Sequence, residues 1–152
     1  PYYITGQFLR NFLSTKNHPS AMVLLLQKEV VERIIAQDKK ESLLSLSIKA
    51  YGTPHKITVV HRGSFQPAPN VDSAVIAIEN ISKSFFETIS EERFFNTIKA
   101  AFAHKRKILI SNLSEISEKE KIADVLKELN LPEKSRAEDL TLENWKKISE
   151  RI

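Results

Sequence analysis

The sequence predicts an α/β unit that is followed by a small all-α unit. Runs rich in Ile and Val indicate strands in the first half of the chain, whereas only helix patterns follow Asn80. The change near residues 82–84 divides the chain into residues 1–82 and residues 83–152. An α/β unit that begins with a helix and has only three strands is small for a complete domain, so we expect the second half of a larger sheet.

The first unit is expected to open with a helix, a strand and a second helix. Thr5 can cap a short helix whose apolar side extends to Leu13. Residues 21–26 are apolar on both faces, which is typical of a strand covered by helices on each side of a parallel sheet. Val30 and Ile34 then recur at helical spacing and predict the helix that follows.

The rest of this unit is expected to be one more helix and two strands. Ser42 precedes a helix pattern, and Gly52 occupies the place where a left-handed C-cap would end it. Residues 55–62 and 73–79 are rich in β-branched side chains, which favours two strands. A long connection that contains two prolines, residues 63–72, joins them.

The second unit is expected to hold three helices. Their starts are indicated by Ser90, by a capping box of Ser117 with Glu120, and by Thr141. The apolar positions between residues 94 and 109 predict one continuous apolar face for the first of these helices.

Composition excludes several classes of protein. No apolar run approaches the roughly 20 residues that cross a bilayer, so a soluble protein is expected. The chain has no Cys, which excludes disulfides and Cys-ligated zinc and fits a cytoplasmic location. Gly6, Gly52 and Gly63 stand alone, so the chain contains neither a P-loop nor a GxGxxG turn.

Pro1 is not an initiator Met and no signal peptide follows it, so we expect the chain to begin inside a longer protein.

Charge is segregated along the sequence. The net charge is +4, but acids are absent from residues 1–28, 42–71 and 93–114. Such stretches are typical of a surface that binds a polyanion such as nucleic acid, and a solvated helix face is the alternative interpretation.

The strongest basic run is Lys105-Arg106-Lys107, which lies between Phe102 and Ile108. On a continuous helix three consecutive cations cannot all point away from the apolar face. We therefore expect at least one of them at the edge of that face.

Most catalytic chemistries lack their residues here. The four His show no metal-ligand spacing, and Ser64 lacks the GxSxG turn of a hydrolase nucleophile. Two segments remain, Pro1-Tyr2-Tyr3 and residues 65–73, in which aromatic residues stand beside prolines. Prolines fix the backbone, so an aromatic ring and a carbonyl can be held rigidly there. A simple hydrophobic turn is the alternative interpretation of such a segment.

Several ordered blocks resemble the ribosomal RNA adenine N6,N6-dimethyltransferases of the KsgA type. The segment at residues 1–5 resembles the end of that family's Asn-(Leu/Ile)-Pro-Tyr motif, and residues 65–73 resemble its Phe-x-Pro-x-Pro-x-Val-x-Ser pattern. Residues 27–33 and 101–109 also agree with the family. Residues 136–141 resemble its C-terminal Arg-Ala-Glu-x-Leu block, which favours the ribosomal enzymes over the related erythromycin-resistance methyltransferases.

The resemblance implies an S-adenosylmethionine-dependent enzyme with a Rossmann-like sheet, of which this chain is the C-terminal half, followed by a helical RNA-binding domain. The cofactor site of the family lies upstream of Pro1, so the chain alone is expected to be inactive. The implied substrate is small-subunit (16S) ribosomal RNA or a pre-30S particle, bound by a monomer without a metal. The implied catalytic residues are Pro1 and Tyr2, and the base clamp is Tyr2, Phe65, Pro67 and Pro69. Within the acid-free stretches, the expected RNA-binding residues are Arg10, Lys56, Arg62, Lys105, Arg106 and Lys107.

Two other function classes stay open at this point. A non-catalytic RNA-binding module would keep the same platform, and a helical DNA-binding domain would show base-sequence preference for duplex DNA. No segment suggests a recognition helix as clearly as residues 65–73 suggest a clamp for a base.

Overall fold

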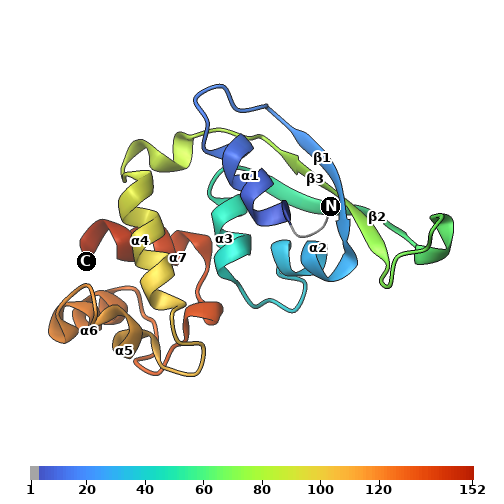
Figure 1. Cartoon of the computed structure of the whole chain (residues 1–152). Helices are drawn as coiled ribbons and strands as arrows, with labels where there is room; N and C mark the ends of the chain where they lie inside the picture. Colours follow the sequence, from blue (N-terminus) through green and yellow to red (C-terminus); the bar gives the residue numbers. More distant parts are fainter. Residues whose placement is uncertain (1–3) are drawn as a thin grey trace. The chain divides into compact units, whose positions relative to one another are not determined.

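The computed structural model describes residues 4–152, which form two compact units. The first contains the chain up to Asp38 and residues 44–84, and the second contains Lys39–Leu43 and Phe85–Ile152. Figure 1 shows the order of the elements. They are α1 (Thr5–Leu13), β1 (Met22–Gln27), α2 (Lys28–Ile34), α3 (Leu43–Lys49), β2 (Thr53–Val60), η2 (Arg62–Ser64), β3 (Ser73–Glu79), η3 (Ser84–Glu87), α4 (Glu91–Ala101), α5 (Leu109–Leu113), α6 (Lys119–Glu128), η4 (Ala137–Asp139) and α7 (Leu142–Arg151).

The first unit is built on a three-stranded sheet with the order β1-β3-β2. Both pairings are antiparallel, and Ser73 at the start of β3 lies opposite Gln27 of β1 and Val60 of β2. A bulge between Lys56 and Thr58 interrupts the pairing of β2 with β3. The two strands expected after Gly52 are therefore confirmed, as is the α/β class with a helical second part.

The expectation of a parallel sheet covered on both sides is wrong for the strands that the structure describes. Ile76 and Ile78, on one face of β3, are fully buried, whereas Val23 and Leu25, on the opposite face of β1, are 68% and 44% exposed. The physical reason is that an apolar run shows which faces are suited to burial and carries no information on the direction of the neighbouring strand. In Figure 1 the helices α1, α2 and α3 lie on one side of the sheet.

Gly52 does not adopt the left-handed conformation, since no glycine among the described residues has a positive φ. A Cβ at this position would lie 2.9 Å from the Glu79 carbonyl oxygen and 3.0 Å from Cγ2 of Ile78. Gly52 is therefore required by the close approach of the α3–β2 turn to the end of β3.

We expect Gly52→Ala to destabilise the protein by about 1–3 kcal/mol, because the new methyl group forces backbone and core atoms apart. Gly6→Ala is the matched control, because nothing lies within 4 Å of a Cβ built there. This control is expected to be neutral or stabilising, since Ala is the better helix former. Urea unfolding of both variants measures the difference, and equal stabilities would contradict the steric explanation.

The second unit packs its helices around Phe94, Leu109 and Trp145, all of which are fully buried. Residues 85, 86, 94 and 95 form a cluster of four Phe rings whose centroid distances run from 5.0 to 6.0 Å. The segment Lys39–Leu43 belongs to this unit because Lys40 pairs with Glu138 and Asp139. The Lys40 ammonium lowers the pKa of the Asp139 carboxyl, mainly through their hydrogen bond.

Two of the expected helix starts in this unit are confirmed. The Ser90 hydroxyl accepts a hydrogen bond from the Arg93 backbone N–H at 3.2 Å, and Thr141 forms a reciprocal capping box with Asn144. The expected box of Ser117 with Glu120 is wrong, because α6 begins one residue later, after Glu118, without a side-chain cap.

At the front of the chain, Ile4 is the N-cap of α1, and Thr5 is its first helical residue rather than its cap. Among the helices of the described part of the chain, none combines the length and apolar character that a membrane span requires.

Candidate functional site

The connection between β2 and β3 carries the aromatic–proline segment. After β2 the chain forms the short helix η2, and Phe65 follows it in an extended conformation with a half-buried side chain. The peptide bond between Gln66 and Pro67 is cis, and Pro69 is half-buried. The structure therefore brings Phe65, Pro67 and Pro69 together in one loop at the end of the β2–β3 hairpin.

The carboxylate of Asp72, at the end of this connection, is bonded to residues at the start of the connection. The Asp72 Oδ1 accepts a hydrogen bond from the Arg62 backbone N–H at 2.9 Å, and its Oδ2 lies 3.5 Å from Nδ1 of His61. The Asp72 carbonyl also accepts a hydrogen bond from the Lys28 N–H at 3.0 Å, which extends the β1–β3 ladder into the first residue of α2. Asp72 thus joins the ends of all three strands at one edge of the sheet.

These contacts lower the pKa of Asp72 below its ordinary value of 3.8. The hydrogen bond from the Arg62 backbone is the main cause, and the charges of His61 and Lys28 add to it. Because the folded-state pKa is lowered, the stabilising effect is present above pH 3.8 and is lost as the pH falls through the lowered value.

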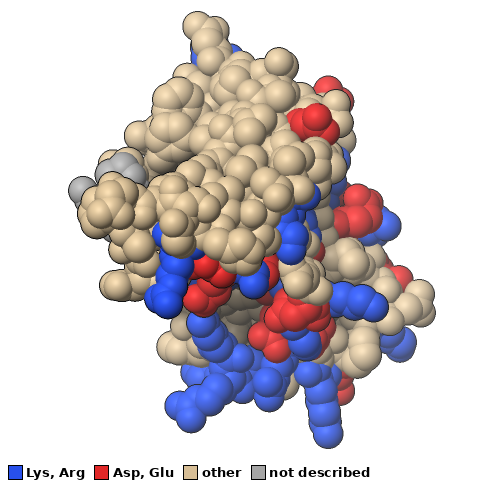
Figure 2. All heavy atoms as spheres, turned by 90° about the vertical axis from the view of Figure 1, so that its right-hand side faces the viewer, with Lys and Arg blue, Asp and Glu red and all other residues tan. Residues whose placement is uncertain are grey.

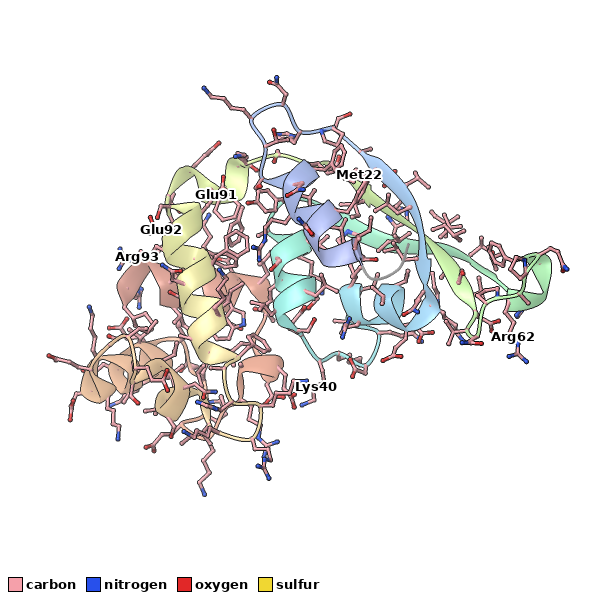
Figure 3. The ribbon with its side chains drawn as sticks, in the orientation of Figure 1. Met22, Lys40, Arg62, Glu91, Glu92 and Arg93 are labelled. Carbon is pink, nitrogen blue, oxygen red and sulfur yellow. The ribbon has the colours of Figure 1, made fainter. Side chains whose placement is uncertain are left out.

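The candidate RNA-binding residues of the first unit are spread over three elements. Arg62 is exposed in η2 and extends from the tip of the hairpin into solvent (Figure 3). Arg10 is exposed on α1. Lys56 is half-buried beside the bulge of β2, and its Nζ donates a hydrogen bond to Oε1 of Gln37 at 3.2 Å. Of these three, only Arg62 lies in the same segment as Phe65.

The basic run of the second unit does not lie on a helix. α4 ends at Ala101, and Lys105, Arg106 and Lys107 occupy a turn that the Lys107 N–H closes with the His104 carbonyl at 3.0 Å. All three side chains are exposed, so the expectation that one lies at the edge of a helical apolar face is wrong. The physical reason is that α5 is a separate helix that begins at Leu109. The side chains between α4 and α5 therefore do not follow helical periodicity.

This turn is free to present its charge to a partner. Among residues 4–152, none forms an ion pair with Lys105, Arg106 or Lys107, while the neighbouring His104 lies 3.7 Å from Glu115. Figure 2 shows Lys and Arg side chains gathered at the bottom of that view. By contrast, Arg93, in the same acid-free stretch of sequence, donates to the carbonyl of Ile152 at 2.8 Å.

Pro1 and Tyr2, the predicted catalytic residues, lie outside the described residues.

Asp72 and His61 are the residues that sequence reasoning missed. Asp72 is part of the aromatic–proline segment, but its role depends on the pairing of β2 with β3, which brings the two ends of the connection together. His61 gives no sequence signal, since it stands alone.

Within residues 4–152 the structure shows neither a cluster of metal ligands nor a glycine turn of the phosphate-binding kind. No three His, Asp or Glu side chains within residues 4–152 come together as metal ligands. Gly6 lies in α1, Gly63 lies in η2, and Gly52 is packed against β3, so none of them forms a turn that cradles phosphates or a nucleoside.

The fold is that of ribosomal RNA adenine methyltransferases. A dimethyladenosine transferase from Plasmodium falciparum superposes with a TM-score of 0.81 at 24% identity, over 97% of this chain and 62% of that protein. The 23S rRNA methyltransferase ErmE superposes with a TM-score of 0.77 at 18% identity, over 99% of this chain and 62% of that protein. At these identities the two structures establish the fold.

The sequence match is closer, and it identifies the family. The family model described as "Ribosomal RNA adenine dimethylase" matches residues 1–152, so the chain belongs to this family. The ribosomal RNA small subunit methyltransferase A of Dehalococcoides mccartyi strain BAV1 is 41% identical over 97% of this chain and 52% of the relative. The proteins of the same name from Fusobacterium nucleatum and Clostridioides difficile are 36% and 35% identical. The chain spans about half the length of the curated relatives that it matches.

Proposed function

We propose that the full-length protein transfers methyl groups from S-adenosylmethionine to N6 of adenines in small-subunit ribosomal RNA, as a step of ribosome biogenesis. In this proposal residues 1–82 complete the catalytic domain and residues 83–152 bind RNA. The observation that carries the proposal is the ordered aromatic–proline connection at Phe65, in a chain that matches the adenine dimethylase family over its whole length.

The reaction requires an adenine outside its stack, because N6 is inaccessible to an enzyme within a helix. An extruded base must be held by flat or apolar surfaces, and a ring that is half-buried at the end of a hairpin leaves part of its surface available for such a contact. Phe65 meets this requirement, with Tyr2 as its proposed partner across the base. Pro67 and Pro69 limit the backbone freedom of the loop that carries the ring.

N6 of adenine is a weak nucleophile because its lone pair is delocalised into the ring. Acceptors for its hydrogens help to turn that lone pair toward the methyl donor, and holding the base in line contributes most of the rate. We propose the backbone carbonyl of Pro1 as one acceptor. S-adenosylmethionine, when bound, supplies an electrophilic methyl group on a sulfonium.

We assign the S-adenosylmethionine site to a further segment of the full-length protein, outside this chain. This segment would also cover an apolar surface of the first unit. Val23 and Leu25 form an exposed apolar strip on the sheet, and a groove of about 430 Å³, lined by Phe8, Phe12 and Val23 among others, adjoins it. Soluble proteins rarely expose contiguous apolar surface of this kind, which supports a further polypeptide segment covering it.

Methylation of unmethylated small-subunit ribosomal particles by the full-length protein tests the proposal. Tritiated methyl transfer, followed by mass spectrometry of the nucleosides, should yield N6,N6-dimethyladenosine. Tight RNA binding without transfer would favour the non-catalytic RNA-binding module, and sequence-selective binding to duplex DNA would favour the DNA-binding class.

The isolated chain is expected to bind S-adenosylmethionine too weakly for calorimetric detection at micromolar concentrations, because it contains no glycine-rich cofactor loop. The full-length protein is the positive control in the same buffer. Stoichiometric binding to the isolated chain would contradict this assignment and would require a cofactor site among residues 1–152.

A further inference from the structure

Asp72 is connected to Phe65 by a short relay of hydrogen bonds. The Asp72 carboxylate accepts from the Arg62 N–H at 2.9 Å, and the Arg62 carbonyl accepts from the Phe65 N–H at 3.3 Å. The carboxylate thus fixes the one turn of η2 from which the aromatic ring emerges. Between Val60 and Ser73 the sheet no longer restrains the connection, because these two residues form the last paired position of β2 and β3.

Asp72 is itself held in place. Its backbone carbonyl is bound to the N–H of Lys28, and the next residue, Ser73, is fully buried and paired with both neighbouring strands. The carboxylate therefore projects from the rigid end of β3 toward η2, whose own backbone bond joins the Ser64 N–H to the His61 carbonyl at 2.9 Å. A side chain anchored at one end of a loop and bonded to the other end limits the conformations that the loop can adopt.

The hydrogen bond to the backbone matters more than the contact with His61. The His61 side chain is 80% exposed, so its interaction with Asp72 across 3.5 Å is screened by water. The Arg62 N–H is a directional donor, and its bond to a carboxylate is charge-assisted.

We propose that Asp72 is a positioning residue, which holds η2 so that Phe65 presents its ring to the extruded adenine. This inference rests on the proposed function and deepens it, because it names a residue that acts on the substrate only through Phe65. Loss of the carboxylate should leave cofactor binding and the proposed phosphate contacts of residues 105–107 intact while the base is held less well, which lowers kcat more than it raises KM.

The test uses the full-length protein with unmethylated small-subunit ribosomal particles. Asp72→Ala is expected to lower kcat by about 10-fold, with KM for the particle and Kd for S-adenosylmethionine within twofold of the parent. Asp72→Asn should recover most of the loss, because the amide oxygen still accepts from the Arg62 N–H. Asp124→Ala, at an exposed position on α6, is the matched control for removal of an aspartate and should match the parent.

Amide hydrogen exchange reports on the relay independently of activity. In Asp72→Ala the Arg62 and Phe65 amides should exchange at least about 10-fold faster than in the parent, while amides of β3 stay protected. If the exchange rate of the Arg62 amide in Asp72→Ala equalled that of the parent, the proposal would be overturned. A kcat within twofold of the parent would also overturn it. A loss of kcat that comes with a lowered Tm and weaker cofactor binding would show a general structural role and would also overturn it.

The two proposals can fail separately. If the parent transfers no methyl group, the proposed function fails, whereas the exchange rates of Arg62 and Phe65 still decide whether Asp72 holds the connection.

Discussion

Phe65→Ala in the full-length protein should reduce methyl transfer by about 5- to 150-fold, because stacking of a base on an aromatic ring contributes about 1–3 kcal/mol. The binding of S-adenosylmethionine should be unchanged, since the ring belongs to the β2–β3 connection and the chain offers no cofactor loop. Single-turnover methylation with saturating particle separates the chemical step from substrate binding.

Two substitutions at the same position separate stacking from packing. Phe65→Tyr keeps the flat ring and is expected to keep most of the activity, whereas Phe65→Leu keeps an apolar side chain of similar size without a π-face and should resemble Phe65→Ala. If Phe65→Leu were as active as the parent, Phe65 would be a hydrophobic turn residue with no role as a base platform.

The elements that the sequence predicts best are those with an unambiguous local signal. β3 matches its predicted range, Ser73–Glu79, because its β-branched residues pair on both sides with other strands. Thr141 caps α7 as expected, because its hydroxyl has only to reach an N–H three residues away. Signals of this kind depend on few residues, so the rest of the fold does not override them.

The wrong expectations share a different cause, which is that the deciding atoms lie far away in sequence. Gly52 was expected to serve as a left-handed cap, but the Glu79 carbonyl 27 residues later explains the need for a glycine. The helix predicted to continue toward Leu109 stops at Ala101, where Asn112 of α5 donates to the Ala101 carbonyl at 2.7 Å and to the His104 carbonyl at 3.1 Å. Such bonds satisfy the carbonyls that a continued helix would otherwise use.

In the candidate site, too, local features could be predicted from the sequence, whereas contacts between residues distant in sequence could not. Phe65, Pro67 and Pro69 could be selected from sequence because an aromatic residue beside prolines is unusual and fits a known pattern. The proposed role of Asp72 could not be predicted from the sequence, because it depends on the strand register that places Ser73 opposite Val60. The distribution of the cations also needed the structure, because Lys56 and Arg93 are bonded within their own units whereas the run at 105–107 is exposed.

Conversion of Lys105, Arg106 and Lys107 to Gln is expected to weaken RNA binding by the full-length protein for matched and unrelated RNAs alike. Each phosphate contact contributes about 0.7–0.9 to the slope of log affinity against log salt, so loss of three contacts should flatten that slope by about 2–3 units. The melting temperature should stay the same, because all three side chains are exposed in a turn and form no ion pair with any described residue.

A charge-matched control decides whether position or net charge matters. Conversion of Lys119, Lys121 and Lys127 to Gln removes the same charge from α6, where Glu118, Glu120 and Asp124 already offset the local potential. If the turn contacts phosphates directly, this control should change the salt slope by less than about 1 unit. Equal slopes for the two triple variants would show that only the overall field attracts RNA, and a lower melting temperature with an unchanged slope in the first variant would show that the turn supports the fold and does not bind RNA.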